Sequence, residues 1–122
     1  MRPGKIESFE DLQVWQKAIE VAAAVYTAFE KCRDFSFRDQ VQRAAVSISS
    51  NIAEGYERDS NADFIRFLYC AKGSCGEVRS QLHLARRVGL LTDQTAEAMI
   101  EEARLLSRKL GAYIKVRETK FS

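Results

Sequence analysis

Arg-Ala-Ala-Val-Ser-Ile-Ser-Ser-Asn-Ile-Ala-Glu-Gly, residues 43–55, is the stretch of this sequence that decides the fold. Arg43, Ser47, Asn51 and Glu54 recur at spacings of four, four and three residues, so in a helix they lie on one face. The residues between them are mostly small or apolar, which suits a helix packed closely against a neighbour. The polar face is therefore either a buried hydrogen-bond network or a functional site.

Start signals outside this stretch predict four helices. Three of them share the pattern Ser-x-x-Asp, in which a hydroxyl precedes a helical pattern and a carboxylate follows three residues later, as in a capping box. These patterns begin at Ser8, Ser36 and Ser60. A fourth start, Thr92, follows Gly89, which suits a helix end. We expect helices over residues 9–32, 37–57, 61–88 and 93–117.

Each predicted helix carries an apolar stripe in alternating steps of three and four residues. This period, with short links between helices, predicts an all-α, antiparallel, up-and-down four-helix bundle. We expect a short arm over residues 1–8, a single bundle domain over 9–117 and a tail over 118–122. The expected core residues are Leu12, Trp15, Ile19, Ala22, Tyr26 and Phe29; Phe37, Val41, Ala44 or Ala45, Ile48 and Ile52; Phe64, Leu68, Ala71, Cys75, Val78, Leu82 and Ala85; and Ala96, Met99, Ala103, Leu106, Leu110 and Tyr113.

The first predicted helix has a second apolar stripe beside the core one. It consists of Val14, Ala18, Val21 and Val25. One bundle core cannot cover both stripes in full, so we expect this face to join copies of the chain in a homo-oligomer. The alternative is a deeply buried central helix.

Composition excludes several classes of protein. The chain has 122 residues, enough for one domain, and its longest apolar run, residues 21–26, is too short to cross a membrane. We expect a cytoplasmic protein without a membrane partner. Three cysteines without Cys-x-x-Cys spacing and one histidine cannot form a conventional zinc site, so we expect no metal and no cofactor.

Catalysis is not expected. A di-iron bundle needs a Glu-x-x-His motif on each of two helices, and His83 is the only histidine. Ser47 and Ser74 lack a base to activate them. Glu54 and Glu77 can both point inward, but neighbouring polar groups would neutralise them. An inward cavity lined by both carboxylates and a metal would instead indicate an enzyme.

Charge is unevenly distributed along the chain. Residues 7–63 hold 11 acids and 6 bases, whereas residues 66–120 hold 6 acids and 11 bases. Several of these bases recur at helical spacing, which makes one face of the third helix and part of the fourth basic. Such stripes attract phosphate backbones, although they are equally typical of solvated helix faces. The candidate nucleic-acid-binding residues are Lys72, Arg79, Arg86, Arg87, Arg104 and Arg108.

Two motifs carry a resemblance to a known family. They are Gln40-x-x-Arg43-Ala44-Ala45-x-Ser47-Ile48-x-x-Asn51-Ile52-Ala53-Glu54-Gly55 and Gly73-Ser74-x-x-Glu77. The chain resembles, over residues 8–115, small bacterial four-helix-bundle proteins first noticed as reading frames inside intervening sequences of large-subunit ribosomal RNA genes. It departs from them mildly at Ser49, where proline is common, and at Cys75, where leucine is common. The resemblance implies a homopentamer.

The chain is also distantly similar to the accessory variability protein of diversity-generating retroelements. That similarity implies a basic surface that engages nucleic acid and a reverse transcriptase, although this chain is less basic. Neither resemblance attaches a reaction to the motif residues. We interpret these residues as a structural polar network rather than a ligand site, and Gly73 and Gly76 as points of close helix packing. The network residues are Arg43, Ser47, Asn51, Glu54, Ser74 and Glu77.

Two hypotheses about function follow. The first is a non-enzymatic homo-oligomeric bundle, pentameric by resemblance, with an accessory role in binding RNA or DNA through its basic stripes. The second is a protein-interaction scaffold without nucleic-acid binding, for example an accessory subunit of a reverse transcriptase.

Overall fold

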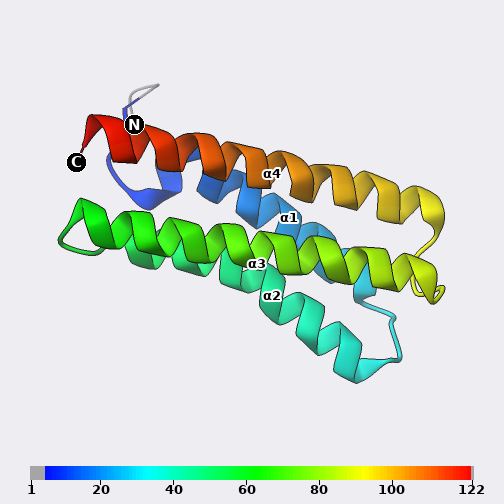
Figure 1. Ribbon diagram of the computed structural model, residues 1–122. Helices are drawn as coiled ribbons and strands as arrows, with labels where there is room; N and C mark the ends of the chain where they lie inside the picture. The colour runs from blue at the N-terminus through cyan, green and yellow to red at the C-terminus, as the bar shows by residue number, and fades with distance from the viewer. Residues whose placement is uncertain (1–4, 122) are drawn as a thin grey trace.

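Four α-helices follow one another up and down the molecule in the computed structural model, which describes residues 5–121 (Figure 1). A short 3-10 helix, η1, precedes them. Each helix packs beside the next, and α1 packs beside α4, whereas within residues 5–121 the backbones of α1 and α3, and of α2 and α4, do not approach each other. The all-α four-helix bundle is thus confirmed. The bounds are η1 Phe9–Asp11, α1 Gln13–Phe29, α2 Phe35–Tyr56, α3 Asn61–Arg87 and α4 Asp93–Lys120.

Local signals explain where α3 and α4 begin. The Ser60 hydroxyl accepts a hydrogen bond from the Asp63 N–H at 3.1 Å, and the Thr92 hydroxyl accepts one from the Thr95 N–H at 3.1 Å. Both caps satisfy amides that the first helical turn leaves without partners. Gly89, just past the end of α3, has φ of 84°, a conformation that glycine adopts readily. The predicted start and stop signals at these positions are confirmed.

The predicted start of the second helix is wrong by two residues. The carboxylate of Asp34, not the hydroxyl of Ser36, accepts the hydrogen bond from the Phe37 N–H, at 3.1 Å. The helix therefore begins at Phe35, and Ser36 lies in its first turn. Asp and Ser are comparable as N-caps, so a sequence with both two residues apart does not fix the start.

The first predicted helix is divided. Leu12, with φ −74° and ψ 128°, is extended and separates η1 from α1. The Asp11 carboxylate accepts hydrogen bonds from the backbone N–H groups of Glu7 and Ser8, so the predicted capping box serves η1 rather than a long helix. At the other end of the chain α4 continues to Lys120, so residues 118–120 of the predicted tail are helical. Residues 1–4 of the predicted arm and residue 122 of the predicted tail lie outside the described residues.

The core confirms the expected stripes of α3 completely and those of α2 and α4 in large part. Phe37, Met99 and Tyr113 are only partly buried, and Ile100 and Ile114 join the core of α4. The predicted stripe residues of α3, all of them buried, are Phe64, Leu68, Ala71, Cys75, Val78, Leu82 and Ala85.

The predicted oligomer face of the first helix is wrong. Its members, Val14, Ala18, Val21 and Val25, are buried inside a single chain. Ile19 and Tyr26, which we expected in the core, are instead 41% and 47% exposed. Both stripes are apolar, and α1 turns its small and β-branched side inward, where those side chains allow closer packing. The alternative prediction for this face, burial within the bundle of a single chain, is therefore correct.

The end of α2 approaches α3 most closely at a glycine. A Cβ atom built on Gly55 would lie 2.5 Å from the Cβ of Phe67 and 3.0 Å from Cδ1 of Phe64. Gly55 is therefore required by close packing. Our expectation for Gly73 and Gly76 was wrong for the single chain, because a Cβ atom at either position would meet open space.

We expect Gly55→Ala to lower the free energy of unfolding by about 1–3 kcal/mol, because the new methyl group overlaps the Phe67 side chain. The matched control is Gly73→Ala, which should raise stability by about 0.5–1 kcal/mol because alanine favours helix and the site is open. Urea unfolding followed by circular dichroism measures both. Equal effects at the two positions would contradict the packing argument.

Candidate nucleic-acid interface

Two lines of residues lie on the facing sides of α3 and α4, which pack against each other. On α3 the line runs through residues 72, 79 and 86, and on α4 through residues 97, 104 and 111, each at steps of seven. Arg86 forms an ion pair with Glu97 at 3.0 Å. The Cε of Lys72 lies 3.5 Å from where a Cβ on Gly111 would stand. These two contacts fix the antiparallel register of the lines.

The register sets two guanidinium groups level with each other. Arg79 lies midway along the α3 line and Arg104 midway along the α4 line, and both side chains are half-buried. Arg104 pairs with Glu101, one turn before it on α4. Arg79 has no ion pair within residues 5–121. Two cations at the same level on neighbouring helices, of which only one has a carboxylate partner within residues 5–121, favour an anionic group beside them.

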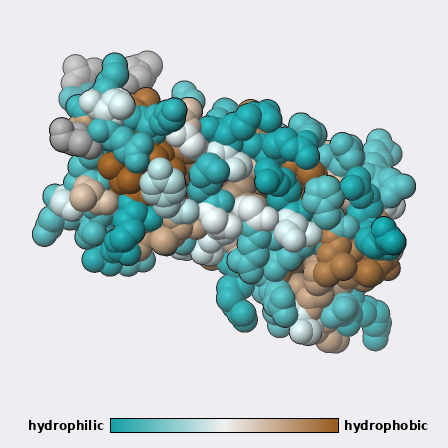
Figure 2. Space-filling view, viewed as in Figure 1, coloured by the Kyte–Doolittle hydropathy of each residue, from teal (hydrophilic) through white to brown (hydrophobic). Residues whose placement is uncertain are grey.

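We call the six predicted cations, Lys72, Arg79, Arg86, Arg87, Arg104 and Arg108, the basic band. Only Arg86 and Arg104 have carboxylate partners among the described residues. Arg87 and Arg108 are exposed, and Lys72 is half-buried. Over the middle of this face of the molecule, hydrophilic side chains are mixed with ones of intermediate hydropathy, and the larger hydrophobic patches lie toward its two ends (Figure 2). Four cations of the band are thus available to a ligand without breaking an ion pair.

A buried thiol lies beneath the band. The Sγ of Cys75 donates a hydrogen bond to the carbonyl of Ala103 at 3.1 Å. Burial raises the pKa of Cys75, although the charges of Arg79 and Lys72 oppose that shift. The thiol therefore stays protonated and structural. All three cysteines are unpaired.

The structure brings together three of the six predicted network residues. The hydroxyls of Ser47 on α2 and Ser74 on α3 are hydrogen bonded at 2.9 Å. The amide of Asn51 donates to the Ser47 hydroxyl at 3.0 Å and to the Ser47 carbonyl at 2.8 Å. We call this group the polar clamp. It spans the two helices and satisfies the buried polar atoms that it contains.

The other three predicted network residues do not join the clamp. Arg43, Glu54 and Glu77 are exposed. Glu54 forms an ion pair with Arg58 at 2.9 Å, and Glu77 accepts a hydrogen bond from Gln81 at 3.5 Å. The two carboxylates are each engaged one turn away on their own helix and do not form the inward pair that acid–base catalysis would use. Glu77 and Arg43 line a shallow pocket of about 390 Å³ without an ion pair between them.

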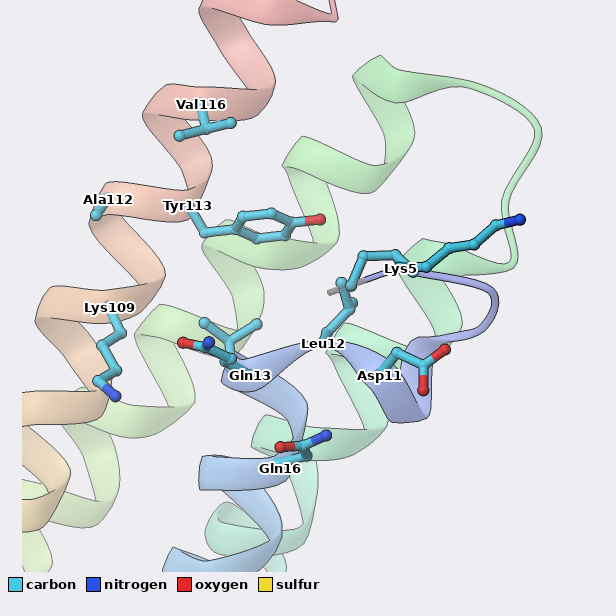
Figure 3. A pocket seen from close by; sticks show the side chains of 11 residues that line it. Lys5, Asp11, Leu12, Gln13, Gln16, Lys109, Ala112, Tyr113 and Val116 are labelled. Atoms are coloured by element: carbon cyan, nitrogen blue, oxygen red, sulfur yellow. The ribbon is translucent and has the colours of Figure 1, made fainter. Parts of the chain in front are cut away.

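A pocket of about 620 Å³ lies between the start of α1 and the last part of α4 (Figure 3). The Asp11 carboxylate in its lining is held by backbone amides, and the Gln16 amide donates to the Glu10 carbonyl. Burial raises the pKa of Tyr113, and the charge of Arg117 opposes that shift. Among the described residues the lining has no His, Cys, Ser or Thr, and its ionisable side chains are Lys5, Asp11, Lys109 and Tyr113.

The described residues contain neither a cluster of metal ligands nor a membrane-spanning helix. Within residues 5–121 no three His, Cys, Asp or Glu side chains gather closely enough to hold a metal ion. In the same part of the chain no helix has the length and apolar character needed to cross a membrane.

The structure also contains guanidinium contacts that the sequence did not indicate. Arg58 and Arg66 lie over the ring of Phe67 at 4.8 and 4.6 Å from its centroid, and Arg117 lies over Phe64 at 5.0 Å. These pairs join the end of α2, the start of α3 and the end of α4. No spacing rule reports them, because the partners meet only after the helices pack.

Comparisons with known proteins point to one family. Residues 10–112 match a model of the 23S rRNA-intervening sequence protein family. The chain is similar to a crystal structure of a protein of unknown function from the S23 ribosomal protein family of Bacteroides thetaiotaomicron. The TM-score is 0.78 with 27% sequence identity, and the match covers 84% of this chain and 98% of that one. The curated proteins contain no match.

We expect Asn51→Ala to lower the free energy of unfolding by about 1 kcal/mol, because it leaves the half-buried Ser47 hydroxyl and carbonyl without that donor. Glu54→Ala is the matched control one turn away. It removes only an exposed ion pair and should change stability by less than about 0.5 kcal/mol. Urea unfolding measures both. A larger loss for Glu54→Ala than for Asn51→Ala would refute the assignment of the clamp.

Proposed function

The chain belongs to the 23S rRNA-intervening sequence protein family, and we propose that it is a non-enzymatic bundle that binds nucleic acid through the basic band in a ribonucleoprotein-associated accessory role. The observation that carries the proposal is the level placement of Arg79 and Arg104 on neighbouring helices, within a band where four of six cations lack carboxylate partners among residues 5–121. Phosphate groups along an RNA or DNA backbone supply the missing anions.

The energetics favour such a ligand. A cation that already has an ion partner must give it up before it binds phosphate, whereas Lys72, Arg79 and Arg108 need not. Binding then releases counterions from the nucleic acid, which is the main source of sequence-independent affinity. Arginine suits this role because its fork of N–H donors matches two phosphate oxygens. Lys72, Arg79 and Arg86 lie along one side of α3, so the band fits a backbone that runs along the bundle.

We extend the proposal to assembly and location. The chain forms a homo-oligomer, a homopentamer by the resemblance of its motifs, and acts in the cytoplasm. Unpaired Cys32, Cys70 and Cys75 support a reducing compartment. Repetition of the basic band in an oligomer sums the fields of the copies and strengthens attraction for a polyanion.

The alternative is a protein-interaction scaffold, for example an accessory subunit of a reverse transcriptase. Exposed apolar side chains favour it, among them Ile19, Tyr26 and Val46 on α1 and α2. In a scaffold the band is a solvated surface, and nucleic-acid binding is absent or insensitive to salt.

We expect the chain to bind structured RNA with an affinity that falls steeply between low and moderate salt. Arg79→Gln should reduce the slope of log K against log salt by about 0.7–0.9 for each copy that contacts the RNA, because one phosphate contact is lost. Fluorescence anisotropy with a labelled RNA hairpin measures the slope.

Lys31→Gln is the matched control for this measurement. Lys31 is exposed, lies outside the band and makes no ion pair within residues 5–121, so its replacement removes the same charge elsewhere. Its binding curve should resemble that of the unsubstituted protein. Equal effects of Arg79→Gln and Lys31→Gln would show that RNA binding depends on the total charge of the protein and not on the basic band. Binding that ignores salt, or no binding, would favour the scaffold.

A further inference from the structure

Two charged residues of the sequence motifs take no part in the polar clamp and line a pocket beside it. Arg43 on α2 and Glu77 on α3 form its charged walls, and the pocket has a volume of about 390 Å³. The other lining residues are Gln40, Ala44 and Ser47. Figure 1 shows the first turns of α2 diverging from α3, and the pocket lies along this part of α2. The clamp borders the pocket through the Ser47 hydroxyl.

The pocket holds one charge of each sign, and the two are not joined. The Arg43 guanidinium makes no ion pair within residues 5–121. Glu77 accepts a hydrogen bond of 3.5 Å from the Gln81 amide and has no cation partner in the same part of the chain. An anionic ligand would be attracted by Arg43 and repelled by Glu77, and a cationic ligand would meet the reverse. The pocket therefore suits an uncharged group that donates hydrogen bonds on one edge and accepts them on another.

A buried acceptor beside Glu77 shows which kind of group is missing. The Oε1 atom of Gln81 is buried and has no hydrogen-bond partner in the described part of the chain. Buried polar atoms in folded proteins are nearly always paired. The amide nitrogen of Gln81 already donates to Glu77, so the acceptors at this point outnumber the donors. A ligand with adjacent N–H groups brings donors to the side of the pocket where the protein has a surplus of acceptors.

Guanine is the nucleobase whose edges match this pair of charged side chains. Its N1–H and N2–H donors fit the two oxygens of a carboxylate, and its O6 and N7 acceptors fit the fork of an arginine. The two edges adjoin, so one planar base can contact Glu77 and Arg43 together. Adenine, cytosine and uracil lack a second N–H position beside the first and cannot engage both carboxylate oxygens. The buried side chain of Ala44 adds a small apolar surface for the face of the base.

Two glycines lower the outer side of α3 between the basic band and the pocket. Gly73 follows Lys72 directly, and Gly76 lies between Lys72 and Arg79 and next to Glu77. A Cβ atom at either glycine would meet open space, so packing within the chain does not require them. Glycine inside a helix lowers stability relative to alanine, and close approach of a ligand backbone explains its use here. A strand held by the band can cross α3 at this level and reach the pocket.

We propose that the α2–α3 pocket binds an unpaired guanine of the RNA that the basic band holds. Glu77 accepts hydrogen bonds from N1–H and N2–H of the base, and Arg43 donates to O6 and N7. The guanine is unpaired, because base pairing in a duplex occupies the same N–H donors. The inference rests on the proposed function and names the part of the RNA that is read. The band supplies sequence-independent affinity, whereas the pocket supplies base preference.

Hairpins that differ at one unpaired base test the pocket with the unsubstituted protein. A labelled RNA hairpin with one guanine in a loop otherwise made of uracil should bind about 5- to 150-fold more tightly than the same hairpin with adenine, the discrimination of one bidentate contact. Inosine, which lacks the N2 amino group, should lose part of this preference through the contact with Glu77. In the same way, 7-deazaguanine, which lacks N7, should lose part of the contact with Arg43. Fluorescence anisotropy at fixed salt measures all four affinities.

Substitutions in the pocket and in the band should separate preference from affinity. Glu77→Ala should lower the guanine-to-adenine affinity ratio by about 5-fold or more and keep the slope of log K against log salt, because no phosphate contact is lost. Arg43→Ala should remove the difference between guanine and 7-deazaguanine. Arg79→Gln should lower the slope and keep the ratio. The matched control, Glu57→Ala, removes an exposed carboxylate just past α2 and should keep the ratio and the slope. Circular dichroism shows that each variant is folded.

The outcomes separate the pocket from the proposed function. Salt-dependent binding with equal affinity for the guanine and adenine hairpins would overturn the inference and leave the role of the basic band intact. A guanine preference that survives both Glu77→Ala and Arg43→Ala would place recognition elsewhere and also overturn the inference. Free guanosine that binds as tightly as the hairpin in calorimetry would assign the pocket to a nucleoside and not to RNA, against the inference. No binding to any hairpin would overturn both proposals.

Discussion

The close packing of α2 against α3 is the constraint on which the rest of this structure depends. At one end of the contact Gly55 lets the backbone of α2 meet the Phe67 side chain, and in the middle the Ser47 and Ser74 hydroxyls share a hydrogen bond. Apolar contacts alone tolerate rotation and sliding, whereas a half-buried hydroxyl pair that is hydrogen bonded has one favourable alignment. The clamp therefore selects the rotation and height of α3. That rotation in turn decides which α3 side chains face α4.

The arrangement of α3 links three different surfaces. One side meets α2 through the polar clamp, a second carries residues 72, 79 and 86 on the side toward α4, and its end presents Leu84 and Val88 to solvent. Because α3 has contacts or exposed apolar residues on several sides, its apolar residues are only weakly concentrated on one face. This explains why its sequence mixes glycines, cations and core residues. The motif residues Ser47, Asn51, Gly55 and Ser74 thus serve the packing of α2 against α3. The proposed function lies on other surfaces, whose orientation depends on this packing.

Helix positions and most of the core could be predicted from the sequence because they depend on local periodicity. The choice of face for α1 could not, since both of its stripes are apolar and only contact with α2 and α4 decides between them. The break at Leu12 escaped prediction for a related reason: η1 and α1 together have continuous helical spacing, and no Gly or Pro interrupts it. Ser36 and Asp34 show the same limit at a helix start, where two good caps compete.

The same distinction applies to the candidate interface: features of a single helix could be predicted from the sequence, and features that depend on two packed helices could not. A spacing of seven residues was enough to place Lys72, Arg79 and Arg86 on one line, because that spacing is a property of a single helix. The partners of these cations depend on two helices. The register that pairs Arg86 with Glu97 also sets Arg79 beside Arg104, although both features are invisible in a count of charges. The modest net charge of +2 for the whole chain therefore understates the local field beside these cations. A phosphate backbone responds to that local field within about a Debye length, and not to the average over the molecule.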